Sequence, residues 1–171
     1  ESLLSIHRID SEISLLNSHA HAGYIEVSQE VIEILTQVKQ FHMDTEGYFD
    51  ITMKPIMDFW SENSGENETL PVKIRDRVGM NQLLINNEGV RFARKGMALD
   101  LGGFGKGYAI KSILPIMERA SIGSGLISFG ESLIYGLGSH PYGDCWKVSI
   151  PYGDQEQPQV FELNNEALST S

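Results

Sequence analysis

The sequence predicts one α+β domain over residues 1–171, in which helices flank a mostly antiparallel β-sheet. Three observations carry this prediction. One segment has clear helical spacing of its apolar residues, a second reads as a β-hairpin, and several short apolar runs are separated by turn residues. A chain of 171 residues has the size of a single domain that can bury a core.

Two helices are expected in the N-terminal part. Residues 2–17 carry apolar side chains at helical spacing, which is broken at Asp10 and Ser11. Ser28 is the expected N-cap of the second helix, because serine oxygens accept hydrogen bonds from the first free N–H groups. The apolar face of this second helix carries Val31, Leu35, Val38 and His42.

A hairpin and a further helix are expected in the middle of the chain. Residues 83–85 and 90–93 form the hairpin strands, and the hairpin leads into an apolar strand at 98–101. Helical spacing then runs over 109–117 but meets Pro115. Proline costs about 3 kcal/mol in a helix interior, so a kink or an early stop is expected there.

Three short strands are expected after this helix, at residues 126–129, 133–137 and 146–150. Turn residues separate them, which indicates adjacent antiparallel strands. They complete the sheet of the predicted α+β fold.

Charge and composition exclude some partners. The net charge of −10 argues against a nucleic-acid-binding surface and against adhesion to anionic lipid. Cys145 is the only cysteine and cannot form an internal disulfide, so cysteine usage does not distinguish an oxidising from a reducing compartment. No apolar run approaches the length of a membrane span, and no signal-peptide pattern is visible.

The most informative segment is residues 97–109, which read MALDLGGFGKGYA. An apolar run ends in Asp100 and is followed by four glycines within six residues, among which Lys106 stands. Glycines let backbone approach a ligand, and the N–H groups of a helix start attract anions, so the pattern favours phosphate binding. The spacing fits neither a P-loop nor a dinucleotide fingerprint, because Gly107 and Tyr108 stand at required Ser/Thr and Gly positions. A tight strand-to-helix turn without a ligand is the alternative.

Four motifs carry a family resemblance. Residues 98–109 resemble the central motif of the ApbE family, the magnesium-dependent FAD:protein FMN transferases. Residues 45–56, TEGYFDITMKPI, followed by Trp60, resemble its T-x-G-x-F-D-x-T-x-x-P-L segment. Residues 8–17, RIDSEISLLN, resemble its S-E-(L/I)-x-x-L-N stretch, and residues 126–131, LISFGE, stand where the family has N-x-G-G-D. The motifs occur in the family order, so the resemblance covers essentially the whole chain.

The resemblance implies an ApbE-like fold and transfer of FMN from FAD to a Thr or Ser of an acceptor protein, with release of AMP. FAD is then a substrate, Mg²⁺ a cofactor and the acceptor protein a partner. Two alternatives stay open: hydrolysis of FAD to FMN and AMP, and a non-catalytic flavin-binding module. No catalytic residue is identified.

Matching the motifs residue by residue assigns FAD contacts to Asp100 and Lys106, and a metal ligand to Gly103 through its backbone carbonyl. A backbone ligand needs no side chain at that position. One carbonyl with phosphates and waters is a weak magnesium site without further carboxylates.

Four further residues are cofactor-binding candidates through the resemblance. Tyr48, Phe49 and Asp50 match a flavin-contacting triplet, although Phe-Asp here could be only a strand start with an Asp-capped turn. His7 stands where relatives often carry a Tyr that contacts FAD, and a surface histidine is its alternative.

The chain departs from the family pattern in two ways. Glu131 replaces the second glycine of N-x-G-G-D and either crowds a ligand or supplies an acid. The family also has a strand before the first motif and a metal-binding segment after residue 171. We therefore expect a domain truncated at both ends, with an incomplete metal site and little or no transferase activity alone. The resemblance further implies export, as a periplasmic or inner-membrane lipoprotein whose anchor lies outside this chain.

Overall fold

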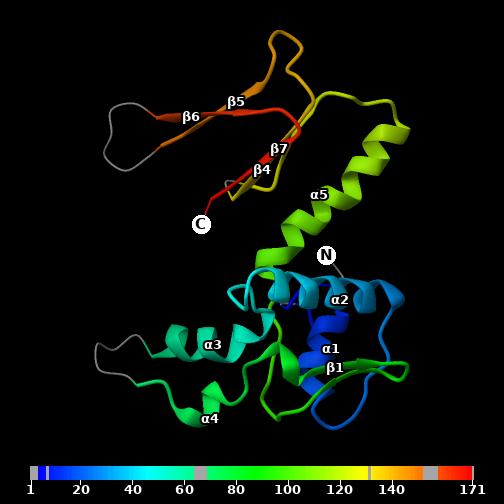
Figure 1. Ribbon diagram of the computed structural model, residues 1–171, viewed down its shortest axis with the longest axis vertical. Coiled ribbons are helices and arrows are strands. Elements are labelled where there is room, and N and C mark those ends of the chain that lie inside the picture. Colours follow the sequence, from blue (N-terminus) through cyan, green and yellow to red (C-terminus); the bar gives the residue numbers. More distant parts are fainter. Residues whose placement is uncertain (1–3, 7, 64–68, 131, 152–157, 171) are drawn as a thin grey trace. The chain divides into compact units, whose positions relative to one another are not determined.

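Helices and antiparallel strands make up the chain, as Figure 1 shows for the computed structural model. The structure describes residues 4–6, 8–63, 69–130, 132–151 and 158–170. The combination confirms the predicted α+β class. The chain divides into two compact units, Glu1–Phe104 and Gly105–Ser171. Within the described ranges no helix has the length and apolar character needed to cross a membrane.

The second predicted N-terminal helix is present in the first unit, whereas the first forms only from Glu12 onward and the described residues before Glu12 are not helical. Helix α1 (Glu12–His19) begins where the apolar spacing breaks, and its N-cap Ser11 accepts a hydrogen bond from the Ser14 N–H. Helix α2 (Gln29–Asp44) begins after Ser28, as predicted, with the Ser28 hydroxyl accepting from the Val31 N–H at 3.3 Å. The buried face of α2 consists of Val31, Ile34, Leu35 and Val38.

The predicted hairpin follows a series of short elements. These are η1 (Ile51–Met53), α3 (Lys54–Glu62), α4 (Val72–Arg75) and η2 (Met80–Gln82). The hairpin pairs β1 (Leu83–Asn86) with β2 (Gly89–Phe92) in antiparallel register, with Leu83 opposite Phe92. Gly89 has a φ of +119°, and a Cβ there would lie 2.1 Å from the Ile25 carbonyl oxygen, so only glycine fits.

The predicted strand at 98–101 is not formed. The backbone of this segment forms hydrogen bonds with the Asn17 side chain and with the Ile51 carbonyl, and not with a neighbouring strand. The Leu99 N–H donates to Asn17 Oδ1 at 2.7 Å, Asn17 Nδ2 donates to the Leu99 carbonyl at 3.0 Å, and the Asp100 N–H donates to the Ile51 carbonyl at 2.8 Å. A side-chain amide offers one donor and one acceptor, as a peptide does, and so replaces the strand partner here.

Helix α5 (Gly102–Arg119) begins in the first unit and continues into the second. It contains Pro115 in its interior, so the predicted early stop is wrong. Proline removes the hydrogen bond to the carbonyl four residues earlier, which is that of Lys111. Lys111 is exposed and Pro115 is exposed, so water can bond to this carbonyl and the helix continues.

The second unit contains the predicted C-terminal strands in two sheets. A three-stranded sheet has the order β3–β4–β7, and β5 pairs with β6; every pairing is antiparallel. The three predicted strands are present, and β3 is adjacent to β4 as predicted. Strand β5 pairs with β6, a strand that was not predicted from the sequence. The bounds are β3 (Gly125–Ser128), β4 (Leu133–Leu137), β5 (Trp146–Ile150), β6 (Gln159–Leu163) and β7 (Glu166–Ser169).

Candidate functional site

Two of the segments that the sequence marks for flavin binding meet in the first unit. The Asp100 N–H is bonded to the Ile51 carbonyl at 2.8 Å. A Cβ built on Gly103 would lie 3.5 Å from Cε2 of Phe49, so the Phe49 ring lies beside the backbone of Gly103. The structure therefore brings Phe49, Asp100 and Gly103 into one neighbourhood.

The backbone of Phe49 is held from both sides. Its N–H donates to Thr45 Oγ1 at 3.1 Å, and its carbonyl lies 2.8 Å from His42 Nδ1. Because a carbonyl only accepts, the Nδ1 atom is the donor in this contact. Tyr48, the preceding residue, is 94% exposed. The end of α2 thus fixes Phe49 and leaves Tyr48 in solvent.

Asp50 forms an Asp-capped turn, which is the alternative to a flavin contact that the sequence leaves open. Its Oδ1 accepts from the Thr52 N–H at 2.7 Å and from the Thr52 hydroxyl at 2.6 Å. Thr52 is fully buried, and its Oγ1 also accepts from the Gly79 N–H at 2.7 Å. The observed contacts of Asp50 Oδ1 are therefore structural, and a flavin contact of Asp50 stays a prediction.

The glycines of the central motif lie inside α5 rather than in a loop before it. Gly102 and Gly103 are its first residues, and Asp100 Oδ1 accepts from the Gly102 N–H at 2.7 Å. A carboxylate is favoured at a helix N-terminus, because unpaired N–H groups and the helix dipole attract negative charge. One N–H that was expected to face a phosphate is thus bonded to Asp100.

Lys106 and two further glycines of the motif belong to the second unit. Lys106 is exposed, and its Nζ donates to the Ser132 hydroxyl, which donates to the Phe129 carbonyl at 3.3 Å. A Cβ built on Gly105 or Gly107 would meet nothing within 4 Å. The helix surface beside Lys106 is therefore open to a ligand, which is the property expected of a phosphate-binding segment.

The structure does not test two of the residues that the sequence singles out, and it adds two that the sequence did not indicate. His7 and Glu131 lie outside the described residues, so their contacts stay predictions. Sequence reasoning missed Asn17 and Ser132. Asn17 ends one of the four motifs, but its partner Leu99 is 82 residues away. Ser132 directly follows Glu131 and stands at the Asp position of N-x-G-G-D.

A metal site is not completed by the described residues. Among them, no group of three or more His, Cys, Asp or Glu side chains could hold a metal ion. Gly103 can offer only a backbone oxygen, and Asp100 Oδ1 is already bonded to Gly102. The described residues therefore do not fit a complete magnesium site.

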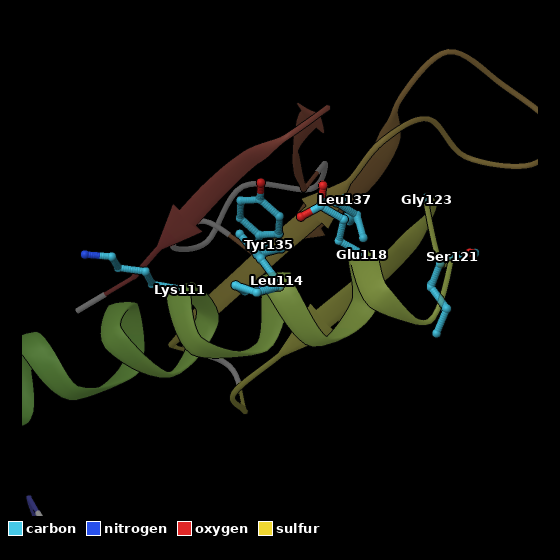
Figure 2. Close-up of a pocket in the computed structure, with 9 residues that line it drawn as sticks. Lys111, Leu114, Glu118, Ser121, Gly123, Tyr135 and Leu137 are labelled. Atoms are coloured by element: carbon cyan, nitrogen blue, oxygen red, sulfur yellow. The ribbon is translucent and has the colours of Figure 1, made fainter. Parts of the chain in front are cut away.

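A pocket of about 500 Å³ lies elsewhere in the second unit, along α5 and β4. Figure 2 shows Leu114 of α5 beneath Tyr135 of β4 in this pocket. Lys111 and Glu118 also line it. Lys106 and Ser132 do not belong to its lining, so the pocket is distinct from the contact between these two residues.

The chain is similar to known proteins over its full length. The model of the ApbE family matches residues 1–171. An FAD:protein FMN transferase of Klebsiella pneumoniae is 28% identical, with 100% of this chain and 52% of the relative covered. One from Salmonella typhimurium is 27% identical, with 99% and 52% covered. The chain thus spans about half the length of these curated relatives.

Solved structures give the same fold. The flavin transferase ApbE from Vibrio cholerae has a TM-score of 0.80 at 21% identity, over 97% of this chain and 56% of that chain. The apo form of the Pseudomonas stutzeri flavinyl transferase ApbE has a TM-score of 0.77 at 22% identity, over 95% and 53%. At these identities the likeness shows the fold.

Proposed function

The chain belongs to the ApbE family, and on that premise we propose that it binds FAD and serves in the transfer of FMN from FAD to a hydroxyl group of an acceptor protein. The curated relatives are FAD:protein FMN transferases, which supports this activity. The observation that carries the proposal is the meeting of Phe49 with Gly103 and of Ile51 with Asp100 in the first unit. Two separate family motifs come together there.

In this reaction an oxygen of an acceptor Thr or Ser attacks the phosphorus of the FMN half of FAD. A new P–O bond forms, the bond from this phosphorus to the oxygen shared with AMP breaks, and AMP leaves with that oxygen. The hydroxyl proton passes to a base, for which the described residues offer no assigned candidate. Positioning and charge stabilisation carry most of the catalysis in such phosphoryl transfers.

Each candidate residue has a role that follows from its chemistry. Lys106 supplies a full positive charge for the pyrophosphate, and the open helix surface at Gly105 and Gly107 lets phosphate oxygens approach. The ring of Phe49 supplies an apolar face for a flavin ring. Asp100 holds the start of α5 through Gly102.

Magnesium is part of this proposal on the family resemblance. Gly103 would lend a backbone carbonyl to the ion, whose role would be to neutralise charge on the phosphates. Because the described residues do not complete such a site, no step of the reaction is assigned to the metal.

Export is also proposed on the family resemblance, either to the periplasm or as an inner-membrane lipoprotein anchored outside this chain. Cell fractionation with an antibody against this chain tests it. Recovery in the cytosolic fraction would contradict it.

The direct test is FAD binding to the 171-residue chain, measured by quenching of flavin fluorescence with and without Mg²⁺. Lys106→Ala is expected to weaken FAD binding about 10- to 100-fold, the size of a lost charge-assisted contact. Lys111→Ala is the matched control, because Lys111 is also exposed on α5, and it should bind FAD as the wild type does. Equal affinities for all three proteins, or no FAD binding at all, would contradict the proposed site.

Product analysis separates the three functions that the sequence leaves open. Covalent flavin on an acceptor protein together with free AMP supports transfer. Free FMN and AMP in equal amounts indicate hydrolysis with water as the acceptor. Binding of intact FAD without AMP indicates a flavin-binding module.

A further inference from the structure

The contact between Lys106 and Ser132 joins α5 to the turn that connects β3 with β4, within the second unit. We propose that Ser132 is a positioning residue that aims the Lys106 ammonium group at a phosphate of the flavin nucleotide. This inference rests on the proposed function, because it assumes that Lys106 binds the pyrophosphate of FAD.

Ser132 is itself firmly placed. Its hydroxyl donates to the Phe129 carbonyl at 3.3 Å, and its carbonyl accepts from the Ser169 hydroxyl at 3.2 Å and from the Thr170 N–H at 3.1 Å. These bonds tie it to the turn on one side and to the last strand on the other. The oxygen that meets Lys106 is therefore a fixed acceptor.

An exposed lysine gains most from such an acceptor. Its four-carbon side chain has many rotamers, and a ligand must otherwise overcome this rotamer entropy when it orders the ammonium group. Donation to Ser132 selects one position for Nζ before the ligand binds. An ammonium group has three N–H donors, so two remain for phosphate oxygens.

Ser132 places Lys106 without cancelling its charge, because a hydroxyl is neutral. Among the described residues, no carboxylate forms an ion pair with Lys106. The combination of a fixed position and a retained charge suits the recognition of a dianionic pyrophosphate.

The turn offers its own matched control. Ser128 stands on the other side of the same turn, and its hydroxyl donates to the Gly130 carbonyl at 2.8 Å. Both serines thus bond a carbonyl of the turn, but the contact with Lys106 belongs to Ser132. Ser128→Ala measures what a lost turn hydrogen bond does to FAD binding.

The test is a double-mutant cycle for FAD affinity in the 171-residue chain. Ser132→Ala is expected to weaken FAD about 3- to 10-fold, the size of one hydrogen bond, while Ser128→Ala stays within about twofold. In the Lys106→Ala background, Ser132→Ala should have no further effect, because Ser132 acts through the lysine. Ser132→Thr keeps the hydroxyl and should bind FAD with the affinity of the wild type.

The inference is overturned if Ser132→Ala weakens FAD equally with and without Lys106, or no more than Ser128→Ala does. If Lys106→Ala lowers the affinity while Ser132→Ala does not, the proposed function stands and the role of Ser132 falls. If the wild type does not bind FAD, both fall. Should Ser132→Ala fail to fold, Ser132→Val is compared with Ser132→Thr, because valine has nearly the shape of threonine without the hydroxyl. Equal FAD affinities of these two folded variants would overturn the inference.

Discussion

Asn17 and Leu99 lie 82 residues apart in the sequence and are joined by two hydrogen bonds. The Leu99 N–H donates to Asn17 Oδ1 at 2.7 Å, and Asn17 Nδ2 donates to the Leu99 carbonyl at 3.0 Å. Leu99 is fully buried and directly precedes Asp100, whose N–H is bonded to Ile51. The last residue of one motif therefore fixes the segment that leads into the central glycine motif. Helix α1 takes part in the candidate site through this amide.

Replacement of Asn17 by Ala should destabilise the fold by about 2–4 kcal/mol. It leaves the N–H and the carbonyl of buried Leu99 without partners, and each unpaired group costs about 1–3 kcal/mol. The free energy of unfolding in urea measures this. Ser18→Ala is the control on the same helix, because it removes an exposed hydroxyl bonded to the Ser14 carbonyl and should change stability by less than about 1 kcal/mol. Equal effects of the two variants would contradict the assigned role of Asn17.

Thr52→Val should destabilise the first unit by about 2–3 kcal/mol although valine has nearly the same shape. The buried hydroxyl of Thr52 donates to Asp50 Oδ1 and accepts from the Gly79 N–H. Valine leaves the Gly79 N–H unpaired and leaves Asp50 Oδ1 with only the N–H of residue 52. Thr52→Ser keeps the hydroxyl and loses one methyl group, which costs about 1 kcal/mol. Thermal or urea unfolding of both variants is the measurement. A serine variant less stable than the valine variant would show that packing of the methyl group matters more than these bonds.

The local elements were predictable where neighbouring residues decide them. The N-cap at Ser28 and the β1–β2 hairpin follow from side chains within a few positions. The segment at 98–101 has strand-like residues, but its partner is an asparagine side chain from α1, which no local pattern reveals.

The site was predictable as a list of residues rather than as an arrangement. The family resemblance selects Phe49, Asp100 and Gly103, and the structure places them together through long-range contacts. Glycine disfavours helix, so the sequence indicates a glycine-rich turn where α5 in fact begins. The Asp100 carboxylate at the first N–H helps the helix begin there nevertheless.

Gly136→Ala should destabilise the second unit by about 1–3 kcal/mol, as expected of an overpacked site. A Cβ on this residue of β4 would lie 2.8 Å from Cβ of Leu163 and 3.2 Å from Cδ1 of Trp146. Gly143→Ala is the control, because a Cβ there would meet nothing within 4 Å. Thermal unfolding of the two variants should separate them clearly. A Gly136→Ala protein as stable as the Gly143→Ala protein would mean that the sheet adjusts without cost.

Gly105→Ala and Gly107→Ala should stabilise the chain while weakening FAD binding. Alanine is better than glycine in a helix interior by about 0.5–1 kcal/mol, and a Cβ at either position meets open space. Stability alone would thus favour alanine in this part of α5. If the glycines instead keep the helix backbone open to phosphate oxygens, the added methyl groups will obstruct the ligand. Thermal unfolding and flavin fluorescence titration on the same variants measure the two effects.

Ser112→Ala provides the control for a stabilised α5. Ser112 lies on the same helix, is exposed and bonds to the Tyr108 carbonyl, and alanine has the higher helix propensity. This variant should keep its FAD affinity, since it adds no atoms beside the glycines. Unchanged FAD affinity in all three variants would mean that the glycines serve neither the fold nor the ligand. Lower affinity confined to Gly105→Ala and Gly107→Ala would mean that the ligand, rather than helix stability, accounts for glycine at these positions.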